Sequence, residues 1–130
     1  FGDAEDPKLR ERVAKALNGK SYARLLLAKQ AWQSPGKEDE ARALLSTALA
    51  DAEASLEIAP DNPIMLGNKG YVLFLLGRED DAKPELRRAL ELGGEEMREG
   101  ELEDAGKHPL PQDEEFKDLI NSLWDEVSKD

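Results

Sequence analysis

Apolar side chains recur every three or four residues through most of the chain, which is the spacing of helices with one buried face. The clearest case is residues 60–92, which predict two antiparallel helices joined at Gly77. Asp61 or Asn62 caps the first helix, acidic residues open the second, and Gly93-Gly94 ends it. The apolar positions of this stretch are Leu66, Leu73, Leu76, Ala82, Leu86, Ala89 and Leu90.

A shorter helix is predicted at the start of the chain, over residues 7–18. Asp6-Pro7 combines a capping carboxylate with a proline in the first turn, and Asn18-Gly19 is a stop signal. Its apolar residues Leu9, Val13 and Leu17 form a narrow stripe. This helix is therefore expected to cover the open end of the elements that follow.

Residues 22–62 predict a second helical pair. Ser21 caps a helix from Tyr22 to about Gln33, and Ser34-Pro35-Gly36 forms a turn. Neither glycine nor proline occurs between Lys37 and Ala59. One uninterrupted helix is therefore predicted from about Glu38 to Ile58, about two turns longer than usual. The extra length is expected to support the terminal helices rather than to contact a ligand.

The helical pattern weakens after Gly94. Residues 95–111 have room for one or two helical turns at 95–104 and are otherwise predicted to form an acidic loop. Long helices are disfavoured here by four residues, namely Gly100, Gly106, Pro109 and Pro111.

The last predicted helix, residues 112–128, has the strongest apolar stripe of the chain. Gln112 or Asp113 is expected to cap it. Its stripe consists of Phe116, Leu119, Ile120, Leu123, Trp124 and Val127. This helix either covers the last hydrophobic face of the array, which we favour, or docks into the groove of its own or a neighbouring molecule.

The central stretch resembles a tetratricopeptide repeat, a helical hairpin of about 34 residues with small residues where its helices meet. The pattern is carried by Leu66, Gly70, Leu73, Gly77, Ala82, Leu86 and Ala89, and more weakly by Leu25, Trp32, Gly36, Ala41, Leu45 and Ala48. Lys69 and Ala28-Lys29 depart from the Leu-Gly pair. The resemblance implies an all-α fold, an α-α superhelix of two tetratricopeptide-like hairpins (22–62 and 63–94) in a single domain.

Proteins of this family bind peptides or partner helices on a concave face lined by the first helix of each repeat. The resemblance implies a partner-binding groove lined by Ala23, Leu26, Gln30 and Gln33 in the first repeat and by Ile64, Gly67, Asn68, Tyr71, Phe74 and Leu75 in the second. Such a groove is apolar with amide edges and suits an extended segment or an amphipathic helix. Alternatively, Tyr71 and Phe74 pack against the terminal helices.

Some relatives in that family clamp the C-terminal carboxylate of a chaperone with lysine and asparagine side chains. Asn68 matches the asparagine of that motif's second repeat, but the first-repeat lysine position holds Leu26 and the first-repeat asparagine position holds Gln30. The clamp is therefore not expected, and Asn68 is expected to bond to a backbone or ligand amide within the groove.

The net charge is −11, and most of it lies in the last third of the chain, where residues 93–130 carry 13 acidic and 4 basic side chains. An acidic field favours basic protein or peptide partners over nucleic acid and anionic membranes. The longest apolar run, residues 71–76, is too short to span a bilayer. The chain has no cysteine and begins with Phe1, so we expect a processed form or a fragment, and its compartment stays open.

Groups that would carry chemistry are sparse. His108 is the one histidine and has no visible nucleophile or second metal ligand near it in sequence. The acidic run at 95–104 lacks the spacing of a calcium loop, and Gly93-Gly94 lacks the context of a phosphate loop. We therefore expect no catalytic residue, no metal and no cofactor.

These patterns favour a non-catalytic protein-protein interaction module, an adaptor or assembly scaffold, that acts as a monomer or weak homodimer. One alternative is a small acidic chaperone for an export substrate. The other is an oligomerisation module that uses the C-terminal helix.

Overall fold

The computed structural model describes residues 6–129, and these residues form five helices without strands. The helices are α1 (Pro7–Trp32), α2 (Glu38–Ile58), α3 (Pro63–Leu75), α4 (Glu79–Ala105) and α5 (Gln112–Val127). The chain is therefore all-α, and it is built from helical hairpins.

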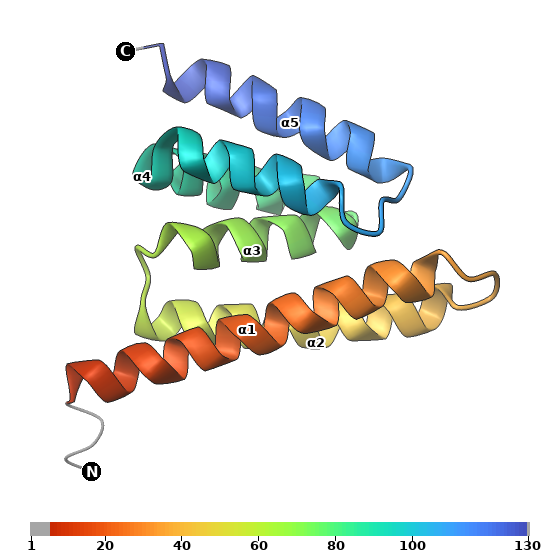
Figure 1. Ribbon diagram of the computed structural model, residues 1–130, viewed down its shortest axis with the longest axis horizontal. Coiled ribbons are helices and arrows are strands. Elements are labelled where there is room, and N and C mark those ends of the chain that lie inside the picture. The colour runs from red at the N-terminus through yellow and green to blue at the C-terminus, as the bar shows by residue number, and fades with distance from the viewer. Residues whose placement is uncertain (1–5, 130) are drawn as a thin grey trace.

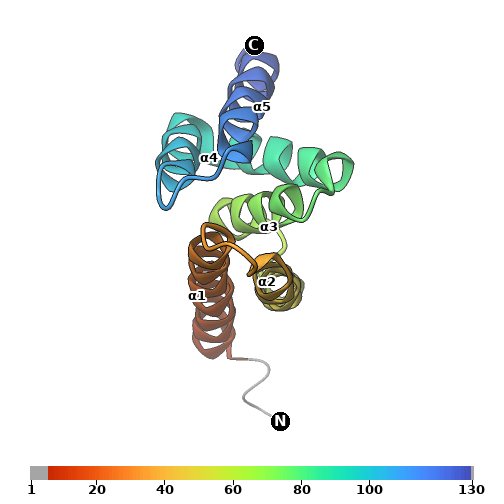
Figure 2. The same cartoon turned by 90° about the vertical axis from the view of Figure 1, so that its right-hand side faces the viewer.

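Consecutive helices pack against one another. α1 lies along α2, α3 lies along α4, and α5 packs on α4 (Figure 1). Seen from the side, α1 and α2 form one end of the stack, α3 and α4 the middle and α5 the other end (Figure 2). Fewer contacts join α3 to α2, α1 and α5. The hairpins therefore share one core along the stack.

Local signals set the hairpin geometry as predicted. The Oδ1 atoms of Asp6 and Asn62 accept backbone N–H groups in the first turns of α1 and α3. Gly36 and Gly77 both have φ of 83°, which is the left-handed region that a turn glycine supplies. Gly70 lets α4 approach closely, since a Cβ added there would lie 2.5 Å from Cγ of Leu86.

The predicted helix break at Asn18-Gly19 is wrong, because α1 continues through it. Ser21 does not cap a new helix. Its side chain is fully buried, and its hydroxyl donates to the backbone carbonyl of Ala48 in α2, at 2.7 Å. Arg24 forms a further ion pair with Asp51. The long α2, uninterrupted as predicted, thus holds α1 helical along its length, and packing overrides the weak helix propensity of Asn and Gly.

The predicted acidic loop at 95–111 is also wrong over most of its length. Gly94 has φ of 67° and ψ of −153°, so the backbone turns sharply there, and the helix then resumes as far as Ala105. Figure 1 shows this second half of α4 crossing in front of the first half, on the same side as α1. This part of the chain stays helical despite Gly100 because Glu101 and Ala105 are buried. Of the predicted loop, only a short linker over residues 106–111 is left outside the helices.

α5 buries its apolar stripe within the chain. Phe116, Ile120 and Leu123 are all buried. Neither Gln112 nor Asp113 caps it, contrary to the prediction, because the helix begins after Pro111 without a side-chain cap. The Asp113 carboxylate instead turns back to accept the Leu110 N–H at 2.7 Å. In this structure α5 therefore covers the end of the stack, as the favoured prediction has it, and its Phe116 also lies on part of the predicted groove face, as in the alternative.

Candidate functional site

The predicted groove face is partly covered by the protein's own chain. Gln30 lies 3.1 Å from Nε2 of His108, and Gln33 donates to the carbonyl of Pro109 at 3.0 Å. The linker thus crosses the part of the face that α1 contributes. Tyr71 stacks on Phe116 of α5 with ring centroids 4.2 Å apart, and Phe74 lies 5.2 Å from the same ring. These two aromatic residues follow the alternative prediction, in which they pack against a terminal helix.

The other predicted groove residues have different surroundings. Leu26 packs against the hydrophobic core, and Leu75 is buried in it. Gly67 is buried beneath the second half of α4, whereas Ile64 at the start of α3 is 63% exposed. The structure therefore does not bring all ten predicted residues to one open surface.

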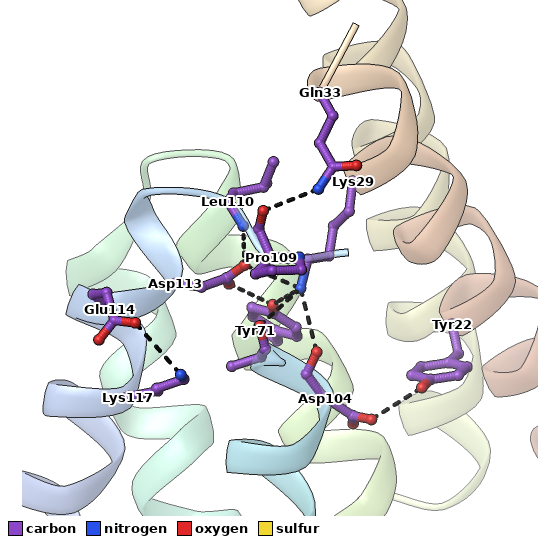
Figure 3. Close-up of polar contacts among 11 residues, drawn as sticks. Tyr22, Lys29, Gln33, Tyr71, Asp104, Pro109, Leu110, Asp113, Glu114 and Lys117 are labelled. Carbon is purple, nitrogen blue, oxygen red and sulfur yellow. Dashed lines mark hydrogen bonds and ion pairs between the residues drawn. The ribbon is translucent and has the colours of Figure 1, made fainter. Parts of the chain in front are cut away.

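A buried charge network fixes the junction between the hairpins and α5 (Figure 3). The Lys29 ammonium lies 3.1 Å from the Asp113 carboxylate and donates to the hydroxyl of Tyr71 at 2.5 Å. It also donates to the backbone carbonyls of Asp104 and Ala105. Tyr71 in turn donates to Asp113, also at 2.5 Å. One network therefore connects α1, α3, the end of α4 and the start of α5.

This network suits a structural role. Burial lowers the pKa of Lys29, while the hydrogen bond to Asp113 opposes that shift. Burial also raises the pKa of Tyr71, and its hydrogen bond to Asp113 adds to the effect. The donors and acceptors satisfy one another and are closed off from solvent. The network therefore holds the covered half of the face together.

The rest of the face stays open as a groove of about 610 Å³, which we name the α1–α3–α4 groove. Its walls come from Lys15–Tyr22 of α1 and from Gly93–Asp104 of α4. Its floor comes from the start of α3, between Asn62 and Tyr71. Of the ten predicted residues, three line it: Ile64, Asn68 and Tyr71. The sharp turn at Gly94 creates the groove by carrying α4 back toward α1 (Figure 1).

Most of the groove surface is apolar, and polar atoms lie at its base. Met65 and Met97 supply flexible apolar side chains, which adapt to varied partners. Asn68 donates its amide to Ser21 Oγ at 2.7 Å, rather than to the backbone or ligand amide that the sequence predicted. Glu101 is 3% exposed, and burial together with the charge of Asp104 raises its pKa to about 8.

Two of the buried polar residues were missed from sequence, and each carried a weak signal. Lys29 stands where the repeat pattern has its small glycine, so its side chain enters a helix interface. Glu101 follows Met97 and precedes Ala105 at intervals of four, which places it on an apolar helix face once Gly100 is accepted inside a helix.

Within residues 6–129, no cluster of three His, Cys, Asp or Glu side chains is arranged to hold a metal ion. None of the helices described is both long and apolar enough to cross a bilayer. No family model, curated protein or solved structure matches this chain.

Proposed function

We propose that this protein is a non-catalytic protein-binding module that holds a segment of a partner in the α1–α3–α4 groove. The observation that carries the proposal is the groove itself, which stays open although α5 and the linker cover the neighbouring half of the face. Its volume lies within the range of pockets that bind ligands specifically. A groove of this volume accommodates a few side chains, either from an extended segment or from one face of a helix.

The composition of the groove supports a protein partner. Ile64, Met65 and Met97 line the groove with apolar side chains, and of these Ile64 is 63% exposed. The acidic charge of the C-terminal third adds attraction for a basic segment. We further propose that the two hairpins are tetratricopeptide-like, supported by the turn glycines and by the contact between Gly70 and Leu86.

Of the alternatives, exchange of α5 between molecules draws little support from the geometry. Phe116, Ile120 and Leu123 are already buried within one chain. A swapped dimer would bury the same residues and gain little apolar area. An export chaperone would use the same groove and differ only in its partner, so it is a special case of the proposed function.

A display selection tests the proposal directly. The purified protein is used to select from random displayed peptides, and the selected peptides are then tested against Gly100→Phe. Gly100 lines the groove and a Cβ there meets no atom within 4 Å, so the new side chain starts from open space and is expected to obstruct the groove. Peptides that bind in the groove should lose affinity by about tenfold or more, equivalent to about 1.4 kcal/mol.

The control variant is Glu99→Phe, which places the same ring at an exposed position of α4 outside the groove lining. Circular dichroism verifies that both variants keep their helicity. Peptides that bind Gly100→Phe and wild type equally would place the binding surface elsewhere. A selection that yields no binding peptide would overturn the proposed function.

A further inference from the structure

Three buried acceptors without partners meet in the α1–α3–α4 groove. Within the described part of the chain, the buried side-chain polar atoms that lack a hydrogen bond are Oδ1 of Asn18, Oδ1 of Asn68 and Oε2 of Glu101. All three residues line the groove, and they come from three different helices. Buried polar atoms are nearly always paired, and an unpaired one costs about 1–3 kcal/mol. Their concentration in residues that line one groove makes it the place where added donors would gain most.

The orientation of the Asn68 amide follows from its neighbours. The Ser21 hydroxyl donates its hydrogen to the carbonyl of Ala48 at 2.7 Å. The Ser21 oxygen can then only accept from Asn68, so the amide nitrogen of Asn68 must face Ser21. The Asn68 oxygen is thereby left free, and a flip of the amide would break the bond to Ser21.

Glu101 is held at the base of the groove by a close approach between α3 and α4. A Cβ added to Gly67 would lie 2.2 Å from Oε1 of Glu101, so any other residue at position 67 would displace the carboxyl from this place. Oε1 thus lies against the backbone of α3, while Oε2 has no partner among the described residues. A carboxyl desolvated in this way stabilises a cation that reaches it, because the pair is attracted in a medium of low polarity.

The helices around these acceptors leave space where a ligand would enter. Gly19 in α1 and Gly100 in α4 both line the groove, and a Cβ at either position meets no atom within 4 Å. Each glycine lies inside a helix, where it costs about 1 kcal/mol relative to alanine. No close packing contact requires glycine at either position. Both glycines therefore widen the groove and lower the stability of their helices.

We infer that the α1–α3–α4 groove receives a lysine side chain of the partner segment, with the ammonium group bound by Glu101 and Asn68. This inference rests on the proposed function. The aliphatic stem of the lysine would lie along Ile64, Met65 and Met97. The ammonium would donate to Glu101 Oε2 and Asn68 Oδ1, and its third hydrogen is available to Asn18. Glu101 accepts in this way as a carboxylate, so binding of the ammonium releases the proton that the folded protein holds below about pH 8.

An ammonium group fits these acceptors better than a guanidinium group. A guanidinium binds a carboxylate best when both oxygens accept in parallel, and Oε1 of Glu101 is turned against Gly67. An ammonium needs single acceptors in different directions, and the free oxygens on three helices are of that kind. A carboxylate partner is disfavoured because it has no donors for these acceptors.

Titration followed by NMR tests the inference on the intact protein. The probe is N-acetyl-lysine amide, and its matched control is N-acetyl-norleucine amide, in which a methyl group replaces the ammonium. We expect the lysine probe to shift the signals of Gly19, Gly100 and the Asn68 side-chain amide, and to bind at least about tenfold more tightly than the norleucine probe. N-acetyl-arginine amide should bind more weakly than the lysine probe.

Variants locate the contact. Glu101→Gln keeps the shape of the side chain and should weaken the lysine probe by about tenfold or more, while leaving the norleucine probe unchanged. Glu99→Gln removes an exposed carboxylate from the same half of α4 and should change neither. Peptides from the display selection should be enriched in lysine, and replacement of that lysine by norleucine should reduce their affinity similarly.

The outcomes separate this inference from the proposed function. If displayed peptides bind in the groove but show no lysine enrichment, or if the norleucine and lysine probes bind equally, the proposed function stands and the ammonium site is wrong. Tighter binding of the arginine probe would overturn the choice of ammonium. Tighter binding of spermidine than of a lysine-containing displayed peptide would overturn the assignment to a partner segment.

Discussion

The ammonium group of Lys29 and the carboxylate of Asp113 lie 3.1 Å apart, with side-chain exposures of 0% and 2%. They belong to α1 and α5, at opposite ends of the stack (Figure 2). Through Tyr71 and the carbonyls at the end of α4, this pair joins elements that are far apart in sequence. It therefore decides which half of the face is closed by α5 and which half stays open.

Lys29→Met should destabilise the protein by about 3–5 kcal/mol, because it leaves Asp113 buried without its counter-charge. Urea unfolding followed by circular dichroism measures the free energy of unfolding. The double variant Lys29→Met/Asp113→Leu should lose less than the two single variants together, since no charge remains buried alone.

The exposed pair Lys117 and Glu114, also visible in Figure 3, is the control. Lys117→Met should change the free energy of unfolding by no more than about 1 kcal/mol. Equal effects of Lys29→Met and Lys117→Met would contradict the structural role assigned to the buried pair.

Glu101 should make stability depend on pH in a defined window. Its pKa is about 8 in the folded protein against an ordinary value of 4.5, mainly because burial disfavours its charge. Between these values the folded chain holds a proton that the unfolded chain has released. The free energy of unfolding should therefore fall as pH rises across this window.

Glu101→Gln should remove that fall, which amounts to on the order of a few kcal/mol, and should make the protein more stable than wild type at about pH 8. Urea unfolding at about pH 5 and about pH 8 gives the comparison. Wild type and Glu101→Gln share the other titratable side chains of the groove, so a difference between them reports Glu101. These shared side chains are Lys15, Tyr22, Tyr71, Glu96 and Asp104. Parallel pH dependences of wild type and variant would show that burial does not raise the pKa of Glu101.

Two glycines should respond in opposite ways to alanine: Gly100, which lines the groove, and Gly67, which is buried beneath the second half of α4. Gly100→Ala should stabilise the protein by up to about 1 kcal/mol, since the methyl group meets open space and improves helix propensity. Gly67→Ala should destabilise it by about 1–3 kcal/mol, because its Cβ would collide with Glu101 and Met97. Thermal unfolding of both variants measures the difference, and the same sign for both would contradict the described groove geometry.

Gly94 should be the residue that shapes the groove. Its φ of 67° and ψ of −153° lie in a region that only glycine adopts readily. Gly94→Ala should cost about 1–3 kcal/mol and should shift the NMR signals of groove residues on both α1 and α4. Gly19→Ala, a helical glycine with open space at its Cβ, is the matched control and should not destabilise. A Gly94→Ala variant that unfolds like wild type would mean that the turn does not depend on this conformation.

The sequence alone predicted the features that depend on residues close to one another in the chain. The caps at Asp6 and Asn62, the turn glycines Gly36 and Gly77, the unbroken α2 and the apolar stripe of α5 all depend on neighbours one or two turns away. Backbone sterics, capping hydrogen bonds and helical periodicity determine such features locally. The all-α class followed from them.

Tertiary contacts decided the rest, because they outweigh local propensities of about 1 kcal/mol per residue. Asn18-Gly19 looks like a helix stop until Ser21 meets Ala48 on α2. The sequence of residues 95–105 predicts a solvated acidic loop. In the folded chain the backbone turns at Gly94, and Glu101 is buried in the helix that follows. Whether a charged side chain lies at the surface or is buried as a hydrogen-bond acceptor depends on which elements pack against it. The groove and its unpaired acceptors are thus properties of the folded arrangement, which no local pattern records.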